Sequence, residues 1–263
     1  MTTPASPAQP VRPTLSAIVI TKNEERAIRR CLESVAWADE IVVVDSGSTD
    51  RTPEICRELG VRFHATEEWP GYGPQKNRAL RAATSEWVFS IDADEWVTPE
   101  LRAEIEHALR KNDRADGYAL PRRSSFCGRF MQHSGWWPDY VVRLFRRNAG
   151  HFSDDPAHER VIVTGKVARL REPLMHEAIL NLEQMIAKMD AYSTATAQMK
   201  FARGERSTLL SALLHGVWTF VRTYLLRLGF LDGREGFYFA RLHAFYEFLS
   251  VAKTYELTHR PND

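Results

Sequence analysis

Two aspartates in a short acidic segment are the residues of this chain most suited to binding a metal ion. The segment FSIDADEW, residues 89–96, runs from apolar, strand-forming residues into Asp92 and Asp94, which are two positions apart. Carboxylate oxygens are ligands of Mg²⁺ or Mn²⁺, which leave their other positions to water and phosphate. The same charges would also stabilise the beginning of a helix near Thr98, so the spacing alone leaves both interpretations open.

A second polar segment, VVVDSGSTD at residues 42–50, follows another apolar run. Its small and hydroxylic residues would let backbone N–H groups approach an anion or a base closely. Asp45 could accept hydrogen bonds from a uracil N–H or a ribose hydroxyl. The alternative is a structural turn in which the Asp45 carboxylate caps the next helix.

The elements that must position these carboxylates alternate between strand and helix. Four apolar, β-branched runs read as strands, at residues 15–21, 40–44, 61–64 and 87–91. Helical spacing follows three of them, with Asn23 or Glu24 opening the first helix, Thr49 or Asp50 capping the second, and residues 75–83 forming the third. This alternation predicts an α/β fold with a parallel sheet covered by helices on both faces. Ligands of such sheets bind at the carboxyl ends of the strands, where Asp45 and Asp92 would lie.

The second half of the chain has a different pattern. A helix is expected at residues 101–110, followed by strands at 118–120, 140–145 and 160–163 and by helices from 182 to about 257. The first fourteen residues contain four prolines and no apolar run, so we expect a disordered tail and no export signal.

Composition narrows the class of protein. The chain of 263 residues is 44% hydrophobic and 26% charged, which is ordinary for a folded soluble protein. Its formal net charge of +1 does not support a nucleic-acid-coating surface. The three cysteines form no C-x-x-C pair, which suits a reducing compartment.

Four motifs in order resemble the nucleotide-sugar half of family 2 glycosyltransferases with the GT-A fold. They are ITKNEE (20–25), VVVDSGSTD (42–50), QKNRAL (75–80) and SIDADE (90–95). The segments SGWWPDYVVRLFRR (134–147), AHERV (157–161) and RTYLLRLGFLDGREGFYFA (222–240) are similar to lipopolysaccharide core glucosyltransferases of the WaaE type. The resemblance implies a GT-A catalytic domain at 15–180, divided at residue 100 into nucleotide-sugar and acceptor halves, and a helical extension at 181–263.

The resemblance also assigns roles to individual residues. It places Thr21, Asn23, Glu24 and Asp45 in a uridine pocket. Lys76 and Asn77 would face the nucleotide, and Lys76 or Arg78 would lie near the diphosphate. Asp92 would lie beside the ribose and the metal, and Asp94 would be the direct metal ligand. His176 falls where many GT-A enzymes place a late histidine on the metal, with a surface histidine as the alternative.

Glu159 is the candidate general base that would take the proton of the acceptor hydroxyl. The resemblance puts the pair His158-Glu159 on the acceptor side, although family members with an aspartate base differ here. Asp139, Asp154 and Asp155 compete for the same role, as does a purely structural Glu159.

The C-terminal region combines apolar helices with positive charge. Residues 208–221 form an uncharged stretch of fourteen, shorter than the roughly 20 that span a bilayer, and Arg222 and Arg227 interrupt its continuation. Residues 200–241 contain seven Lys and Arg against three Asp and Glu. This composition predicts an interfacial contact with an anionic membrane. The alternative is a helical appendage packed on the catalytic domain or on a second subunit.

Together these observations favour an inverting, metal-dependent enzyme that transfers a hexose, with UDP-glucose the expected donor, to a lipopolysaccharide core or other cell-envelope glycan. We expect it in the cytoplasm, peripheral on the inner membrane, with no nucleic-acid partner. A nucleotide-sugar binding protein without turnover and a transferase for a different lipid-linked glycan are the alternatives. A nucleotidyltransferase would need a glycine-rich loop after the first strand, whereas no glycine lies between Leu15 and Gly47.

Overall fold

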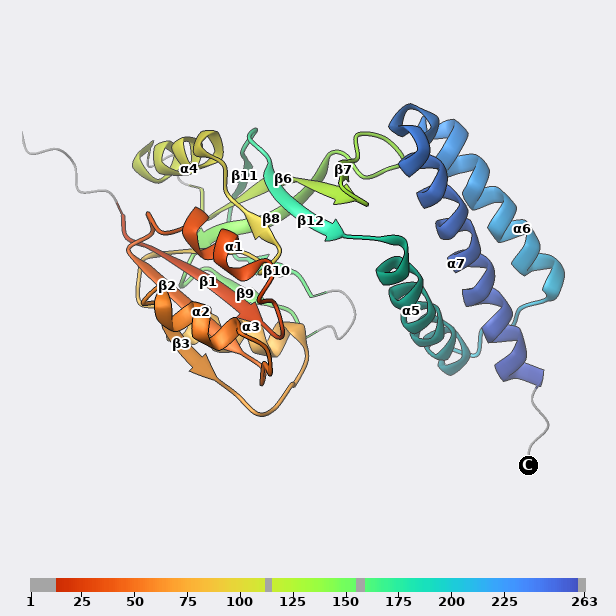
Figure 1. Ribbon diagram of the computed structural model, residues 1–263, viewed down its shortest axis with the longest axis horizontal. Coiled ribbons are helices and arrows are strands. Elements are labelled where there is room, and N and C mark those ends of the chain that lie inside the picture. Colours follow the sequence, from red (N-terminus) through yellow and green to blue (C-terminus); the bar gives the residue numbers. More distant parts are fainter. Residues whose placement is uncertain (1–12, 112–114, 155–158, 260–263) are drawn as a thin grey trace, which may run out of the picture. The chain divides into compact units, whose positions relative to one another are not determined.

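The computed structural model describes residues 13–111, 115–154 and 159–259 (Figure 1). The chain divides into two compact units, Met1–Arg122 with Tyr140–His176, and Arg123–Asp139 with Glu177–Asp263. We call the second the helical unit and the first the catalytic unit, after the catalytic domain that the resemblance predicts. Residues 123–139, which the sequence placed inside a domain ending at 180, group with the C-terminal helices instead. Most of the expected disordered tail, residues 1–12, lies outside the described residues.

The first half of the catalytic unit alternates strands and helices as expected. Its elements are β1 (Leu15–Thr21), α1 (Ile28–Ser34), β2 (Glu40–Asp45), α2 (Thr52–Glu58), β3 (Arg62–Ala65), α3 (Tyr72–Ala82), β4 (Trp87–Ser90), β5 (Glu95–Trp96) and α4 (Pro99–Lys111). The second half is mostly strands: β6 (Gly117–Phe126), β8 (Asp139–Arg146), β9 (Gly150–Phe152), β10 (Val161–Val163), β11 (Val167–Arg169) and β12 (Leu174–Ile179). The predicted α/β class is confirmed.

The strands of the main sheet follow the order β3-β2-β1-β4-β8-β6-β12-β5. The strands β3, β2, β1 and β4 are parallel to one another, and β8 joins β4 antiparallel. In this register Thr21 lies beside Asp45, so the ends of β1 and β2 are level. The carboxyl ends of the parallel strands therefore meet at one edge of the sheet.

Alternate side chains of the parallel strands enter two separate cores. Leu15, Ala17 and Val19 of β1 pack with residues of α1, α2 and α4 on one face. Ile18 of β1 packs on the other face with α3 and with Phe145. Because both faces are covered, these strands are apolar along their length, which is why the sequence reveals them so clearly.

Two helices begin later than the sequence predicts. Helix α1 begins at Ile28 and not at Asn23 or Glu24, and Asn23 itself has a left-handed backbone with φ of 56°. Helix α2 begins at Thr52 after Arg51. Asp50 nevertheless accepts a hydrogen bond from the Thr52 N–H at 3.0 Å, so its carboxylate serves the start of that helix.

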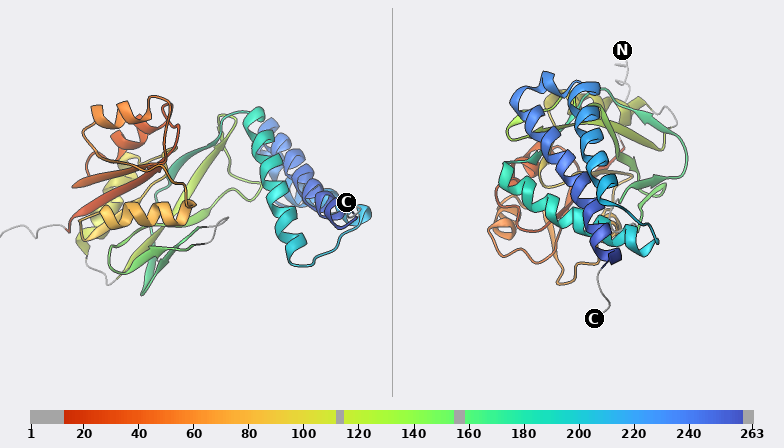
Figure 2. Two further views of the ribbon diagram at one scale, coloured as in Figure 1. Left: turned by 90° about the horizontal axis from the view of Figure 1, so that it is seen from below. Right: turned by 90° about the vertical axis from the view of Figure 1, so that its right-hand side faces the viewer.

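The helical unit contains α5 (Leu182–Ala202), α6 (Leu209–Phe220), a π-helical turn η1 (Val221–Leu226), a short 3-10 turn η2 (Gly229–Asp232) and α7 (Gly233–His259). Helix α7 packs against both α5 and α6 (Figures 1 and 2). The hairpin strand β7 (Arg129–Phe130) pairs with the end of β6. Trp136 stacks edge-on against Phe126 and Phe239, with ring centroids 6.2 and 5.0 Å away, which gives this tryptophan a core role.

Candidate active site

The loops after β1 and β2 are joined to each other by hydrogen bonds. The Asn23 N–H donates to Ser48 Oγ at 2.7 Å, and the Thr49 N–H donates back to Asn23 Oδ1 at 2.8 Å. The Glu24 N–H donates to Thr52 Oγ1 at 2.8 Å. Since these bonds link two strand ends, they fix the loops that were expected to line the nucleotide pocket.

Asp45 lies at the bottom of this pair of loops with 2% of its surface exposed. Its Oδ1 accepts from the N–H groups of Gly47 and Ser48 at 3.0 and 2.9 Å, and its Oδ2 from the Ser48 hydroxyl at 2.5 Å. Asp45 therefore closes a turn within its own loop and does not cap α2, which begins at Thr52. A contact between Asp45 and a nucleotide stays a prediction.

Thr21, the neighbour of Asp45 in the sheet, has an unusual hydroxyl. The side chain is buried, and its Oγ1 has no hydrogen-bond partner within the described part of the chain. Buried polar atoms are normally paired because leaving one unpaired costs about 1–3 kcal/mol.

Helix α3 supplies three polar residues with different partners. The Gln75 amide, fully buried, donates from Nε2 to Ser46 Oγ and Thr66 Oγ1 at 2.9 and 2.8 Å. The Asn77 side chain donates to the carbonyl of Phe152 and accepts from its N–H, at 2.9 and 3.0 Å. Asn77 is thus turned to β9, and its expected contact with the nucleotide stays a prediction.

Lys76 brings two expected site residues together. Its Nζ lies 2.8 Å from Asp92 Oδ1 and 2.8 Å from Glu159 Oε1, while only 5% of its side chain is exposed. The Lys76 ammonium group on α3 therefore brings together two carboxylates that are far apart in the sequence. Asp92 follows β4, and Glu159 precedes β10. Of the competitors of Glu159, Asp155 lies outside the described residues.

The acidic loop after β4 is held by an arginine that the sequence reasoning did not identify. Arg143 of β8 donates from Nη2 to Asp92 Oδ2 at 2.5 Å and to Glu95 Oε1 at 2.6 Å. Glu95, 1% exposed, also accepts the Asp92 N–H through Oε2 at 3.0 Å. The only available signal was charge: an arginine inside the strand VVRLF must have an anionic partner if that strand is buried.

These charges lower the pKa of Asp92. Burial by itself would raise the pKa of Asp92, but the charges of Arg143 and Lys76 outweigh it and hold that pKa well below its ordinary value. Burial would likewise lower the pKa of Arg143, yet Asp92 and Glu95 raise it. Because both Asp92 oxygens are occupied by cations, Asp92 is poorly placed as a metal ligand in this arrangement.

Asp94 and His176 do come together. Strand β12 pairs with β5 so that His176 lies opposite Glu95, and His176 Nε2 lies 3.4 Å from Asp94 Oδ2. About 32% of the Asp94 side chain is exposed and can reach a ligand. The Asp94 carboxylate fits a Mg²⁺ or Mn²⁺ ion whose other positions are filled by water and a diphosphate, while the His176 imidazole suits Mg²⁺ less well. No group of three or more metal-binding side chains occurs among the described residues.

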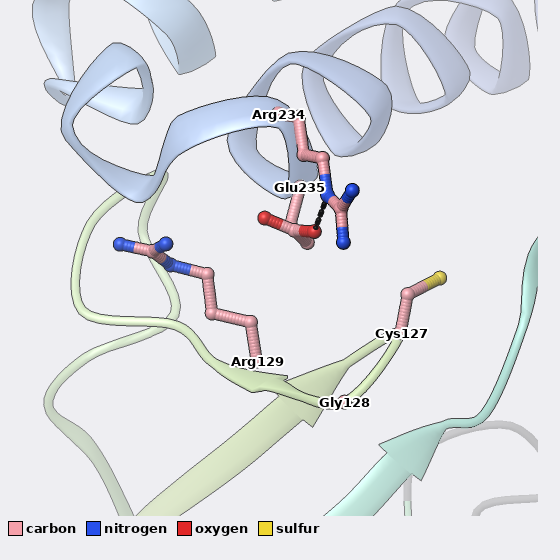
Figure 3. Close-up of a pocket in the computed structure, with 5 residues that line it drawn as sticks. All are labelled: Cys127, Gly128, Arg129, Arg234 and Glu235. Carbon is pink, nitrogen blue, oxygen red and sulfur yellow. Dashed lines mark hydrogen bonds and ion pairs between the residues drawn. The ribbon is translucent and has the colours of Figure 1, made fainter.

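A hollow of about 530 Å³ lies elsewhere, in the helical unit. It is lined by Cys127, Gly128, Arg129, Arg234 and Glu235, none of them an expected site residue (Figure 3). In the close-up the Arg234 guanidinium contacts Glu235, with Nε 2.5 Å from Oε1. The cluster of Lys76, Asp92 and Glu159, in which charged side chains meet, is therefore the better candidate for an active site.

Comparisons with known proteins agree with the motifs. The model of "Glycosyl transferase family 2" matches residues 16–170. The lipopolysaccharide core biosynthesis glycosyltransferase LpsC of Rhizobium meliloti is 34% identical over 94% of this chain and 95% of its own length. An uncharacterized glycosyltransferase of Rickettsia bellii is 30% identical over 93% of this chain and 87% of its own.

Among solved structures, the mannosyltransferase PcManGT from Pyrobaculum calidifontis, in complex with GDP-Man and Mn²⁺, aligns with a TM-score of 0.51. It is 17% identical and covers 95% of this chain and 77% of its own, which establishes a shared fold. The family model covers more than half of the chain and the LpsC match nearly all of it. This protein therefore belongs to glycosyl transferase family 2 and is a glycosyltransferase.

Proposed function

We propose that the protein is an inverting, metal-dependent hexosyltransferase that uses a UDP-sugar, with UDP-glucose the expected donor. One observation carries this proposal: Asp92 and Asp94 follow β4 together, and Asp94 meets His176 while Asp92 and Glu159 meet at Lys76. The pair Asp94–His176 could hold an ion at a diphosphate, and the cluster at Lys76 could place a carboxylate at an acceptor hydroxyl. A single displacement needs both.

In the proposed reaction a bond forms between the acceptor oxygen and the anomeric carbon of the sugar, and the bond from that carbon to the diphosphate breaks. Glu159 takes the hydroxyl proton, a role that contributes typically ~10²–10⁴-fold. A Mg²⁺ or Mn²⁺ ion held by Asp94 and His176 would offset the charge that builds on the diphosphate. Lys76 orients Glu159, and Arg143 keeps the loop of Asp94 in place.

We propose a lipopolysaccharide core sugar as the acceptor, because the relative LpsC is named as a lipopolysaccharide core biosynthesis glycosyltransferase. Its match covers 94% of this chain and 95% of its own length. Such an acceptor is lipid-linked, so the enzyme would work as a peripheral protein on the cytoplasmic face of the inner membrane. Another lipid-linked envelope glycan is the alternative acceptor, and no feature of the site distinguishes the two.

The decisive test is Asp94→Asn, measured as UDP release from UDP-glucose with acceptor and as Mn²⁺ binding in the presence of UDP. Transfer should fall by at least ~10²-fold, because the variant loses the anionic ligand of the ion. Mn²⁺ binding followed by its electron paramagnetic resonance signal should weaken in parallel. Asp190→Asn is the control, since Asp190 is exposed on α5 and pairs only with Lys253 among the ion pairs described. Full activity of the wild type in EDTA would refute the metal mechanism.

Glu159→Gln tests the proposed base, because it keeps the size of the side chain and removes the carboxylate that would take the proton. In a transferase this variant should bind UDP-glucose and lose transfer together with slow hydrolysis of the donor by water. A Glu159→Gln variant that transfers at the wild-type rate would refute the role of Glu159 as the base.

A further inference from the structure

Helix α6 presents its large apolar side chains outward and its small ones inward. Ala212 and Thr219 are buried and Gly216 is partly buried. A Cβ on Gly216 would lie 3.2 Å from the carbonyl oxygen of Ala244 in α7, so this face approaches α7 closely. A helix of a water-soluble domain normally has the opposite arrangement, with its large apolar residues in the core.

The outward face is apolar along its whole length. Its exposed members are Leu209, Leu210, Leu213, Leu214, Val217 and Trp218, each between 55% and 65% exposed. In the segments that follow, Leu225 and Leu226 of η1 and Phe230 and Leu231 of η2 are exposed as well. We call this surface the α6 face. Small residues between helices and large apolar residues outside are the pattern of helices packed in lipid.

Positive charge lies at both ends of the α6 face. Arg203 and Arg206 precede α6 and Arg227 follows η1, all of them exposed, whereas the exposed Arg234 is paired with Glu235. The Arg241 guanidinium lies 5.7 Å from the Phe220 ring at the end of α6. The charge excess of residues 200–241, seven Lys and Arg against three Asp and Glu, is therefore gathered around an apolar surface. This combination is complementary to a bilayer containing anionic lipids.

Length and charge decide between lying on the bilayer and crossing it. The stretch Leu209–Leu226 is the described helix that is long and apolar enough to span, yet at 18 residues it measures about 27 Å against about 30 Å of hydrocarbon. Its partner α7 carries Arg241, Glu247 and Lys253 within its length, and these charges would have to enter the hydrocarbon with it. Charged side chains are costly at that depth.

We infer that the α6 face lies in the interface of an anionic phospholipid bilayer, with its leucines, Val217 and Trp218 among the acyl chains and the flanking arginines at the phosphates. Binding is monotopic: α6 lies along the membrane plane and does not cross it. The inference rests on the proposed function in one respect, since it names the surface by which an enzyme with a lipid-linked acceptor would reach that acceptor.

The test is co-flotation of the full chain with vesicles of phosphatidylethanolamine and phosphatidylglycerol. Val217→Glu places a charge in the α6 face and should lower the vesicle partition coefficient by ~10-fold or more, since burying that side chain becomes unfavourable. The matched control is Val167→Glu, the same exchange at an exposed valine in the catalytic unit, which should float like the wild type. Vesicles of phosphatidylcholine alone should bind more weakly.

Four results would overturn the inference. The wild type could fail to float with either vesicle, or Val217→Glu could float unchanged. A wild-type dimer that Val217→Glu converts to a monomer, with vesicle binding unaltered, would assign the face to a second copy. Resistance of the bound protein to extraction by alkaline carbonate would show a spanning helix and refute the monotopic orientation.

Failure of this inference and failure of the proposed function give different patterns. Asp94→Asn should lose transfer and float normally, because Asp94 lies in the catalytic unit. Val217→Glu should lose vesicle binding and keep slow hydrolysis of UDP-glucose by water. Circular dichroism of both variants checks that the helices are intact.

Discussion

Arg143 holds the acidic loop after β4 in its conformation by binding two of its carboxylates. It is 5% exposed and binds Asp92 and Glu95 at once, so that the loop between β4 and β5 closes around one guanidinium. Asp92 is thereby paired with cations, whereas the Asp94 side chain stays about 32% exposed. The two aspartates of the DAD motif therefore have different surroundings, and the proposed metal ligand is Asp94.

Replacing Arg143 by Met should lower the free energy of unfolding by about 3 kcal/mol near neutral pH, because it leaves buried carboxylates without their cation. Arg146→Met on the same strand is the control: Arg146 Nε lies 3.8 Å from Asp116 and both side chains are partly exposed, so we expect a loss below about 1 kcal/mol. Chemical denaturation of both variants measures the difference. Equal losses would show that Arg143 has no special structural role.

The low pKa of Asp92 makes part of this stability depend on pH. A carboxyl whose pKa is lower in the folded state contributes fully above its unfolded pKa, near 3.9 for Asp, and loses that contribution as pH falls through the lowered folded pKa. The wild type should therefore lose stability below about pH 4 more steeply than Arg143→Met. Denaturation curves at several acidic pH values test the slope, and parallel slopes would contradict the assignment.

At the scale of elements, the placement of Lys76 depends on how closely α3 approaches the segment after β9. A Cβ on Gly73 would lie 1.9 Å from the Ser153 carbonyl oxygen, and Asn77 one turn later binds the backbone of Phe152. The helix and β9 are thus fixed to each other at two points. The ammonium group of Lys76, between those points, is held where Asp92 and Glu159 can meet.

Gly73→Ala should therefore reduce transfer and stability together. At an open helical position this exchange would stabilise by about 1 kcal/mol, but here the methyl group must push α3 away from Ser153 and carry Lys76 with it. Arg81→Ala, at an exposed position of the same helix, should change stability by less than about 0.5 kcal/mol. Thermal unfolding and the kcat of UDP release measure the two effects, and a stabilised, fully active Gly73→Ala would refute the close contact.

At the scale of the whole molecule, a net charge of +1 conceals an uneven distribution. The region 200–241 carries an excess of four positive charges, so the remainder of the chain is negative overall. Exposed charges act on a membrane only within a Debye length, about 10 Å at 0.1 M salt. Ionic strength should therefore affect steps at the bilayer and leave steps inside the catalytic unit unchanged.

Raising the salt concentration to about 0.5 M should consequently slow transfer to an acceptor embedded in anionic vesicles several-fold. Hydrolysis of the donor by water, measured in the same buffers without vesicles, is the control and should be nearly constant. If both rates fall together, salt acts on the active site and the basic surface has no part in reaching the acceptor.

The sequence by itself determined the α/β alternation, the strands of the parallel half and the family. Buried strands covered on both faces are continuous apolar runs, and the motifs after them are local in sequence. The bounds of those strands agree with the structure to within one or two residues. Loop conformation was harder: the left-handed Asn23 delays α1, because its amide binds Thr49 in a loop more than twenty residues away.

Only the tertiary structure decided which side chains meet. Lys76 and Glu159 are 83 positions apart and Arg143 and Asp92 are 51 apart, and no periodicity in one strand or helix records such pairs. The same holds for the α6 face. Composition indicates an apolar helix, but the side on which its leucines lie depends on where α7 packs, and a helix buries whichever face its neighbour covers.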